Sequence, residues 1–213
     1  MADDLKYGYK GAEPTQSFGN NTGVFDSNDI NNLIADNKWT SFGQLELIET
    51  QEITTATNVI DFTNLGNYNV HFMTVNNAHN ENDNKRLSIR FFENGVLESS
   101  AVYQVASQFG SASNNFIEVR STTYDSLRFG DNFGSATNET MQGYCYFYNL
   151  IDSSKYSFIS FHTSTQNNVN VNCFEFGSGV LPQASTVTGI RLEPAYSYNL
   201  LEADISLYGI RYS

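Results

Sequence analysis

The chain has 213 residues, of which 40% are hydrophobic and 14% aromatic, and this excludes a wholly disordered protein because a sizeable core can be buried. Its 11 basic and 23 acidic residues give a formal net charge of −12, and the basic residues form no stripe, which argues against binding to nucleic acid. Apolar runs are far shorter than the roughly 18 residues of a membrane span, and the acidic N-terminus lacks the apolar segment of a secretory signal, so we expect neither membrane insertion nor export.

The leading segment predicts an extended arm with one short helix. Residues 1–21 show a period of neither 2 nor 3.6 residues. Ile30, Leu33 and Ile34 then fall on one helical face, and Asp26 is suited to cap the first turn. We expect this helix to end near residue 37.

From Trp39 onward the hydrophobic period changes to two, and clusters of turn-forming residues recur about every 8 to 12 residues, as in sandwiches and barrels. Asn94-Gly95 is a strong hairpin signal. Residues 76–84 and 130–135, rich in Asn, Asp, Gly and Ser, are predicted loops. The expected strands, ten or so, lie at 44–51, 58–63, 68–75, 87–91, 101–105, 116–121, 144–150, 156–163, 169–176, 186–193 and 202–212.

These patterns predict an all-β fold, an antiparallel, jelly-roll-like β-sandwich. Its expected division is an anchoring arm with the short helix at 1–38 and a sandwich domain at 39–213. In the last predicted strand, Ala203, Ile205 and Leu207 alternate with polar residues, which is typical of a strand with one face in water.

No catalytic motif is present in the sequence. A G-x-S-x-G turn and the phosphate-binding glycine patterns are missing. His71, His79 and His162 are scattered, and neither Cys145 nor Cys173 has a C-x-x-C partner, so we expect no metal site and no cofactor. The chain is therefore predicted not to be an enzyme.

Two weaker possibilities for chemistry stay open in the sequence. Glycoside hydrolysis needs only two carboxylates close in space, and 23 acidic residues supply many pairs, although solvated surface charge is the favoured interpretation. The acidic loop at 80–84 offers oxygen ligands for calcium but lacks the EF-hand arrangement, which favours a plain turn.

The two cysteines could form a cross-link, and three tyrosines could form a binding surface. Cys145 and Cys173 lie in predicted strands, and two buried free thiols are favoured over a disulfide. Tyr144, Tyr146 and Tyr148 share one face of a strand, which is a binding or subunit-contact surface if it points outward and core if it points inward. Core is the favoured interpretation.

Several segments carry a resemblance to a known group of proteins. Gln16–Asp26 and Asn37–Thr40 resemble the N-terminal module of small virion structural proteins of tailed phages that infect marine bacteria. Ile60–Thr63, Thr188–Arg191 and Ile205–Ile210 are similar to strands of a β-sandwich found in those phages. The resemblance covers both ends well and the middle poorly, and its motifs are structural, so it implies no catalytic residue.

Family membership would imply a non-enzymatic protein of the virion exterior, made in the host cytoplasm, either a capsid decoration (cement) protein or a tail or fibre component. The expected partners are other virion proteins and, in a homo-oligomer, further copies of the chain. The arm would attach it, with five apolar anchors that we predict to bind the partner: Phe18, Val24, Phe25, Ile30 and Leu33.

Alternatively, the chain is a host-recognition module that binds a cell-surface glycan through sandwich loops or a Tyr-bearing face. A glycan depolymerase ranks last.

Overall fold

A computed structural model describes residues 27–35 and 45–211. Contacts divide the chain into two units, Met1–Gly43 and Gln44–Ser213, which are described separately. In the first unit the expected helix is confirmed as α1 (Ser27–Ala35). The predicted anchors Phe18, Val24 and Phe25, the capping Asp26 and the expected boundary at residue 38 lie outside the described residues.

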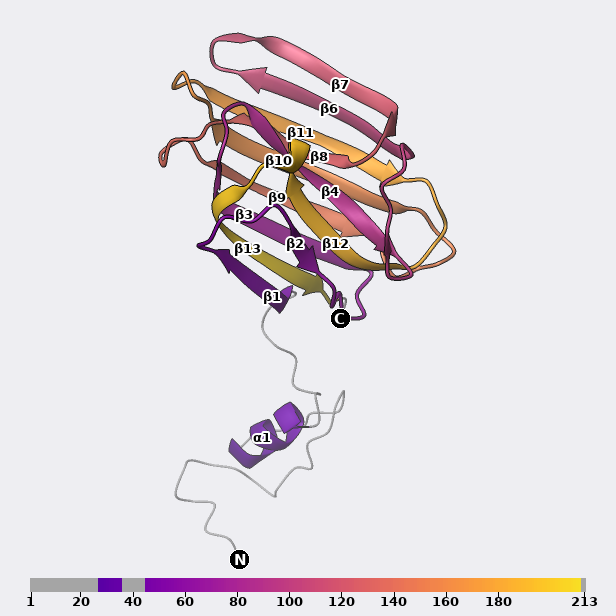
Figure 1. The fold of residues 1–213 in the computed structure, drawn as a ribbon. Helices are drawn as coiled ribbons and strands as arrows, with labels where there is room; N and C mark the ends of the chain where they lie inside the picture. The colour runs from indigo at the N-terminus through magenta and orange to yellow at the C-terminus, as the bar shows by residue number, and fades with distance from the viewer. Residues whose placement is uncertain (1–26, 36–44, 212–213) are drawn as a thin grey trace, which may run out of the picture. The chain divides into compact units, whose positions relative to one another are not determined.

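The second unit is an all-β sandwich of two antiparallel sheets, as predicted (Figure 1). The large sheet has eight strands, in the spatial order β1 (Leu45–Ile53), β13 (Leu200–Ile210), β3 (Val70–Asn80), β9 (Met141–Tyr148), β10 (Ser157–Gln166), β11 (Asn172–Leu181), β6 (Tyr103–Ser111) and β7 (Asn114–Tyr124). The small sheet has the order β2 (Ile60–Phe62), β12 (Val187–Pro194), β4 (Lys85–Glu93) and β5 (Val96–Leu97), and β8 (Leu127–Phe133) also pairs with β4.

The core lies between the two sheets, where alternate residues of each strand meet. Leu87, Ile89 and Phe91 of β4 are completely buried. Ile205 and Leu207 of β13 are buried from the opposite sheet, which confirms the predicted alternation in the last strand. Since each side chain removed from water contributes about 1.5–3 kcal/mol, this layer is the main source of stability.

The predicted hairpin at Asn94-Gly95 is confirmed. Phe92 pairs with Leu97 and Glu93 with Val96, so β4 and β5 are joined by a two-residue turn. Asn94 (φ 48°) and Gly95 (φ 86°) both have left-handed backbone, which is what a tight hairpin with the strand twist requires.

Two segments predicted as loops are strands instead. Residues 130–135 were expected to form a turn, but Leu127–Phe133 forms β8, in which Phe129 and Phe133 are completely buried. Gly130 (φ 75°) and Asn132 (φ 65°) take left-handed conformations inside this strand, which explains why turn-forming residues occur there. Residues 76–80 likewise belong to β3, and the described residues hold thirteen strands where ten or so were expected.

A buried ion pair joins β8 to β11. The guanidinium of Arg128 donates to Glu175 at 2.9 Å and to Asp131 at 2.5 Å, and the hydroxyl of Ser107 donates to Glu175 at 2.6 Å. Burial alone would lower the pKa of Arg128, but the hydrogen bonds and charges of Glu175 and Asp131 outweigh it and raise that pKa. The pair is therefore ionised and fixes the position of β8 over the large sheet.

Three side chains that could have carried chemistry are buried: the thiols of Cys145 and Cys173 and the imidazole of His71. Cys145 and Cys173 are free and buried, as expected, and burial raises the pKa of both thiols. His71 is completely buried, with its Nε2 2.7 Å from the carbonyl oxygen of Leu65. Burial lowers the pKa of His71, and its Nδ1 has no hydrogen-bond partner, so the imidazole is neutral.

Candidate binding face on the large sheet

The three tyrosines of β9 lie on the outer side of the large sheet. The interpretation favoured from the sequence, that they belong to the core, is therefore wrong. Cys145 and Phe147, between them in sequence, are completely buried, while Tyr144 is 42% exposed. Both sides of β9 carry large side chains, so the alternation alone does not show which side is inward. The small sheet covers only the side with Cys145 and Phe147, and the tyrosines face solvent.

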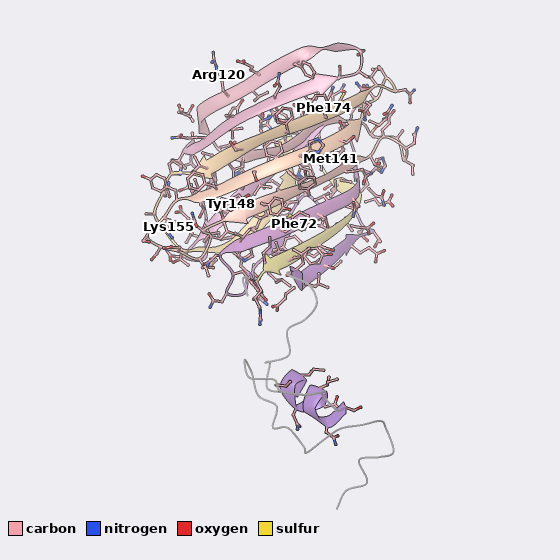
Figure 2. All side chains as sticks on the ribbon, turned by 180° about the vertical axis from the view of Figure 1, so that it is seen from behind. Phe72, Arg120, Met141, Tyr148, Lys155 and Phe174 are labelled. Carbon is pink, nitrogen blue, oxygen red and sulfur yellow. The ribbon has the colours of Figure 1, made fainter. Side chains whose placement is uncertain are left out.

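Register continues the tyrosines into an aromatic surface on neighbouring strands. Tyr146 lies opposite Phe72 of β3, which lies opposite Tyr208 of β13. Ring centroids are 4.8 Å apart for Phe72 and Tyr146 and 6.2 Å apart for Phe72 and Tyr208. These contacts make a row of rings across three strands. Figure 2 views the large sheet from this side, with Phe72 of β3 and Tyr148 of β9 labelled.

A second group of rings extends the surface toward β11. Tyr144 lies 5.9 Å from His162 of β10, which is opposite Phe176 of β11. Phe174 and Phe176 are stacked 6.1 Å apart with an interplanar angle of 4°. We call the whole set the aromatic face, formed by Phe72, Tyr144, Tyr146, Tyr148, Phe158, Phe174, Phe176 and Tyr208.

Apolar residues of the edge strands enlarge the aromatic face. Leu45 pairs with Ile210 and Leu47 with Tyr208, and both leucines are exposed at 48% and 60%. At the opposite edge, Phe116 of β7 lies above Gly110 and 5.6 Å from Phe174. Gly110 is required there because a Cβ would meet both rings.

The centre of this surface carries no charge, although the chain has a net charge of −12. Strands β3, β9 and β10, as described, contain no Asp, Glu, Lys or Arg, and the charged residue of β11, Glu175, points into the core. Hydroxyl and amide side chains fill the positions between the rings, among them Thr74, Gln142, Ser160, Ser164 and Ser178. A neutral surface that carries aromatic rings can contact another protein surface without repulsion between like charges.

A shallow depression of about 510 Å³ lies at one end of the aromatic face, where β10, β11, β6 and β7 pass side by side. Its lining includes Phe158, Val180, Ala106, Ser178, Gln104 and Arg120. One exposed ring next to hydroxyl, amide and guanidinium groups is the combination that binds sugars, by stacking and hydrogen bonds.

Of the predicted anchors, Ile30 and Leu33 fall in the described part of the chain. Both lie on one face of α1 and are partly exposed, and the adjacent Ile34 is 55% exposed. In the first unit, therefore, α1 leaves apolar side chains accessible for contact. The residues predicted to bind a partner all lie in the leading segment, so the prediction missed the aromatic face. The signal for it in the sequence is that β9 carries aromatic residues on both of its sides.

The three histidines lie in different surroundings and do not form a common site. His71 faces the core, His162 faces outward, and the Nε2–H of His79 donates a hydrogen bond to the carbonyl oxygen of Ser135. In the described residues, no cluster of three or more His, Cys, Asp or Glu could hold a metal ion. Asp131 and Glu175 share Arg128, but Glu175 is completely buried, so this carboxylate pair is closed to a substrate.

Comparisons with known proteins give one weak structural match. No family model and no curated protein matches the chain. A solved structure of a protein of unknown function from Shewanella oneidensis MR-1 aligns with 91% of this chain and 100% of its own, at 10% identity and a TM-score of 0.16. Similarity at that level shows neither a shared fold nor a shared function. Within the described residues, no helix has the length and apolar character needed to cross a membrane.

Proposed function

We propose that this chain is a non-enzymatic structural protein on the exterior of a phage particle, as a capsid decoration or a tail or fibre component. The observation that carries the proposal is the uncharged aromatic face on an otherwise acidic protein. The resemblance of the segments around Phe18 and Ile60 to virion proteins supplies the class of particle.

In this proposal the aromatic face binds neighbouring copies of the same chain. Each copy carries a net charge of −12, so two copies repel each other except where neutral surfaces meet. The eight strands, about 4.8 Å apart and about 30 Å long, cover roughly 1,000 Å², and the four without an outward charge, β3, β9, β10 and β11, cover about half of that. A standard interface buries about 800 Å² per partner, so in this proposal the contact extends from the aromatic face onto the flanking strands.

The leading segment attaches the oligomer to another virion protein. Ile30 and Leu33 stand three residues apart on α1, and apolar side chains at this spacing can enter a groove of a partner. Phe18, Val24 and Phe25 are the further proposed anchors. An arm that orders on its partner adds contact area while the sandwich projects away from it.

Particles that lack the chain, mixed with the purified full-length protein and sedimented, test attachment. We expect wild type to co-sediment and the double variant Ile30→Asp/Leu33→Asp to remain in the supernatant. The matched control Asn31→Asp/Asn32→Asp adds the same charge on the exposed side of α1 and should co-sediment. Equal attachment of both double variants would refute anchoring through this helix.

Self-association is tested separately by sedimentation velocity. Phe176→Asp places a charge on the aromatic face and should yield monomers, because an unpaired charge in an interface costs several kcal/mol. Val169→Asp, at a 67% exposed loop position, is the control. A monomeric wild type would contradict the proposed role of the face.

Glycan recognition is the second candidate, and the depression beside Phe158 favours it. Stacking of a sugar on Phe158 with hydrogen bonds from Gln104 and Arg120 would suffice for a weak, specific site. Binding of the full chain to a glycan array, lost in Phe158→Ser and kept in Phe116→Ser, would support this function. Absence of binding to any host-surface glycan would remove it.

A further inference from the structure

A separate pocket of about 470 Å³ lies on the outward side of the small sheet, on the opposite side of the sandwich from the aromatic face. Strands β4 and β12 form its floor, and the β7–β8 turn at Asp125–Ser126 and the 3-10 turn η2 (Ala195–Ser197) contribute to its lining. The lining carries three guanidinium groups, two carboxylates, two hydroxyls near the floor and one exposed ring, from Arg86, Arg90, Arg191, Asp125, Glu193, Ser88, Ser126 and Tyr196.

Three arginines line this pocket in a chain that has only 11 basic residues. Arg191 is neutralised by Asp61, with N–O distances of 2.7 and 2.6 Å. Arg90 contacts Asp125 at 2.9 Å and also pairs with Glu193. Two of the three positive charges therefore have carboxylate partners.

Arg86 differs from the other two arginines. Among the described residues it forms no ion pair and no hydrogen bond, and its guanidinium lies 6.0 Å from the ring of Tyr124. Its Nε is buried and out of reach of a ligand, but the side chain lines the pocket and its positive charge has no carboxylate partner there. An anionic ligand in the pocket would supply the missing opposite charge.

Tyr196 adds a ring at the same pocket. It is 75% exposed and has a left-handed backbone (φ 66°, ψ 23°), an unusual conformation for a bulky residue that is often found at binding sites. The ammonium of Lys85 lies 5.6 Å from the centre of this ring, so a further positive charge stands close by. An exposed ring beside a guanidinium suits a ligand with both a flat apolar side and an acid group.

We propose that this pocket binds an acidic sugar of the hexuronate class. The carboxylate would pair with the guanidinium of Arg86, whose planar donors match two carboxylate oxygens. The sugar ring would stack on Tyr196, and Ser88 and Ser126 offer hydroxyls for its remaining oxygens. The site does not depend on the proposed virion role, because it uses neither the aromatic face nor the leading segment.

Isothermal titration calorimetry of the full chain with sodium glucuronate tests the proposal, with glucose and sodium acetate as probes of ring and acid alone. We expect saturable binding of glucuronate and at least about tenfold weaker binding of both probes. Arg86→Gln should weaken glucuronate binding about tenfold or more, whereas Arg211→Gln, at an exposed arginine outside the pocket, should not change it.

Tyr196→Asn provides an independent test, because asparagine tolerates a left-handed backbone and the position is exposed. This variant should lose affinity for glucuronate even if Arg86→Gln fails to fold. The proposal is overturned if wild type does not bind glucuronate, if acetate binds as tightly, or if neither substitution weakens binding.

Discussion

Replacing Glu175 by leucine should destabilise the sandwich strongly. The carboxylate is completely buried and accepts hydrogen bonds from Arg128 at 2.9 and 3.3 Å and from Ser107 at 2.6 Å. Its removal leaves the guanidinium of Arg128, only 7% exposed, with Asp131 as its remaining carboxylate partner. Breaking a buried ion pair in this way costs about 3–5 kcal/mol.

The double variant Arg128→Met/Glu175→Leu should recover much of that loss. It removes both charges and fills their space with apolar side chains, and replacements of this kind are often neutral or better. We expect it to exceed Glu175→Leu in unfolding free energy by about 2 kcal/mol or more. Lys155→Leu, which breaks an exposed ion pair with Asp152, is the control and should leave the unfolding free energy nearly unchanged.

Urea unfolding followed by far-ultraviolet circular dichroism measures these differences. With a slope of about 2 kcal/mol per molar, Glu175→Leu should lower the midpoint by about 1.5–2.5 M. A loss below about 1 kcal/mol for Glu175→Leu, or a double variant no more stable than the single one, would refute the interpretation of this pair as a coupled buried contact.

Three further outcomes are expected. Burial lowers the pKa of His71 below its usual 6.5, so the contribution of this residue to the unfolding free energy is complete above that pH and falls as the pH drops below it. His71→Gln should therefore flatten the dependence of the urea midpoint on pH between pH 7 and 5, and the same change at the exposed His162 should not. Gly130→Ala should lower the unfolding free energy by at least about 2 kcal/mol in urea titrations, since the backbone is left-handed and a Cβ would overlap the Met141 sulfur; an unchanged midpoint would contradict the β8 geometry. The Cys145 thiol, fully buried with a raised pKa, should react with a thiol reagent only on unfolding, as mass spectrometry of native and denatured protein would show.

The sandwich could be predicted because many strands alternate cleanly between apolar and polar residues. Leu87, Ile89 and Phe91 face the core as their spacing requires, and Asn94-Gly95 forms the turn that its residue types favour. Strand β8 could not be predicted, because its Gly130 and flanking polar residues are typical of loops. Pairing with β4 and burial of its aromatic side chains outweigh that local preference.

The aromatic face could not be assigned from the sequence for a different physical reason. On β9 both alternating sets are apolar enough to be buried, with Phe147 on one side and Tyr146 on the other. Which side is covered depends on where the small sheet packs, and strand order sets that, not local pattern. The unpaired Arg86 is likewise visible only once β4 and β12 lie side by side.

Cryo-electron microscopy of the purified phage particle that carries this chain tests the proposed function most directly. We expect density for the sandwich outside the particle wall, with its aromatic face against another copy and the segment containing Ile30 against a different virion protein. Particles without this chain, or copies whose rings of β9 face open solvent while charged surfaces make the contacts, would contradict it.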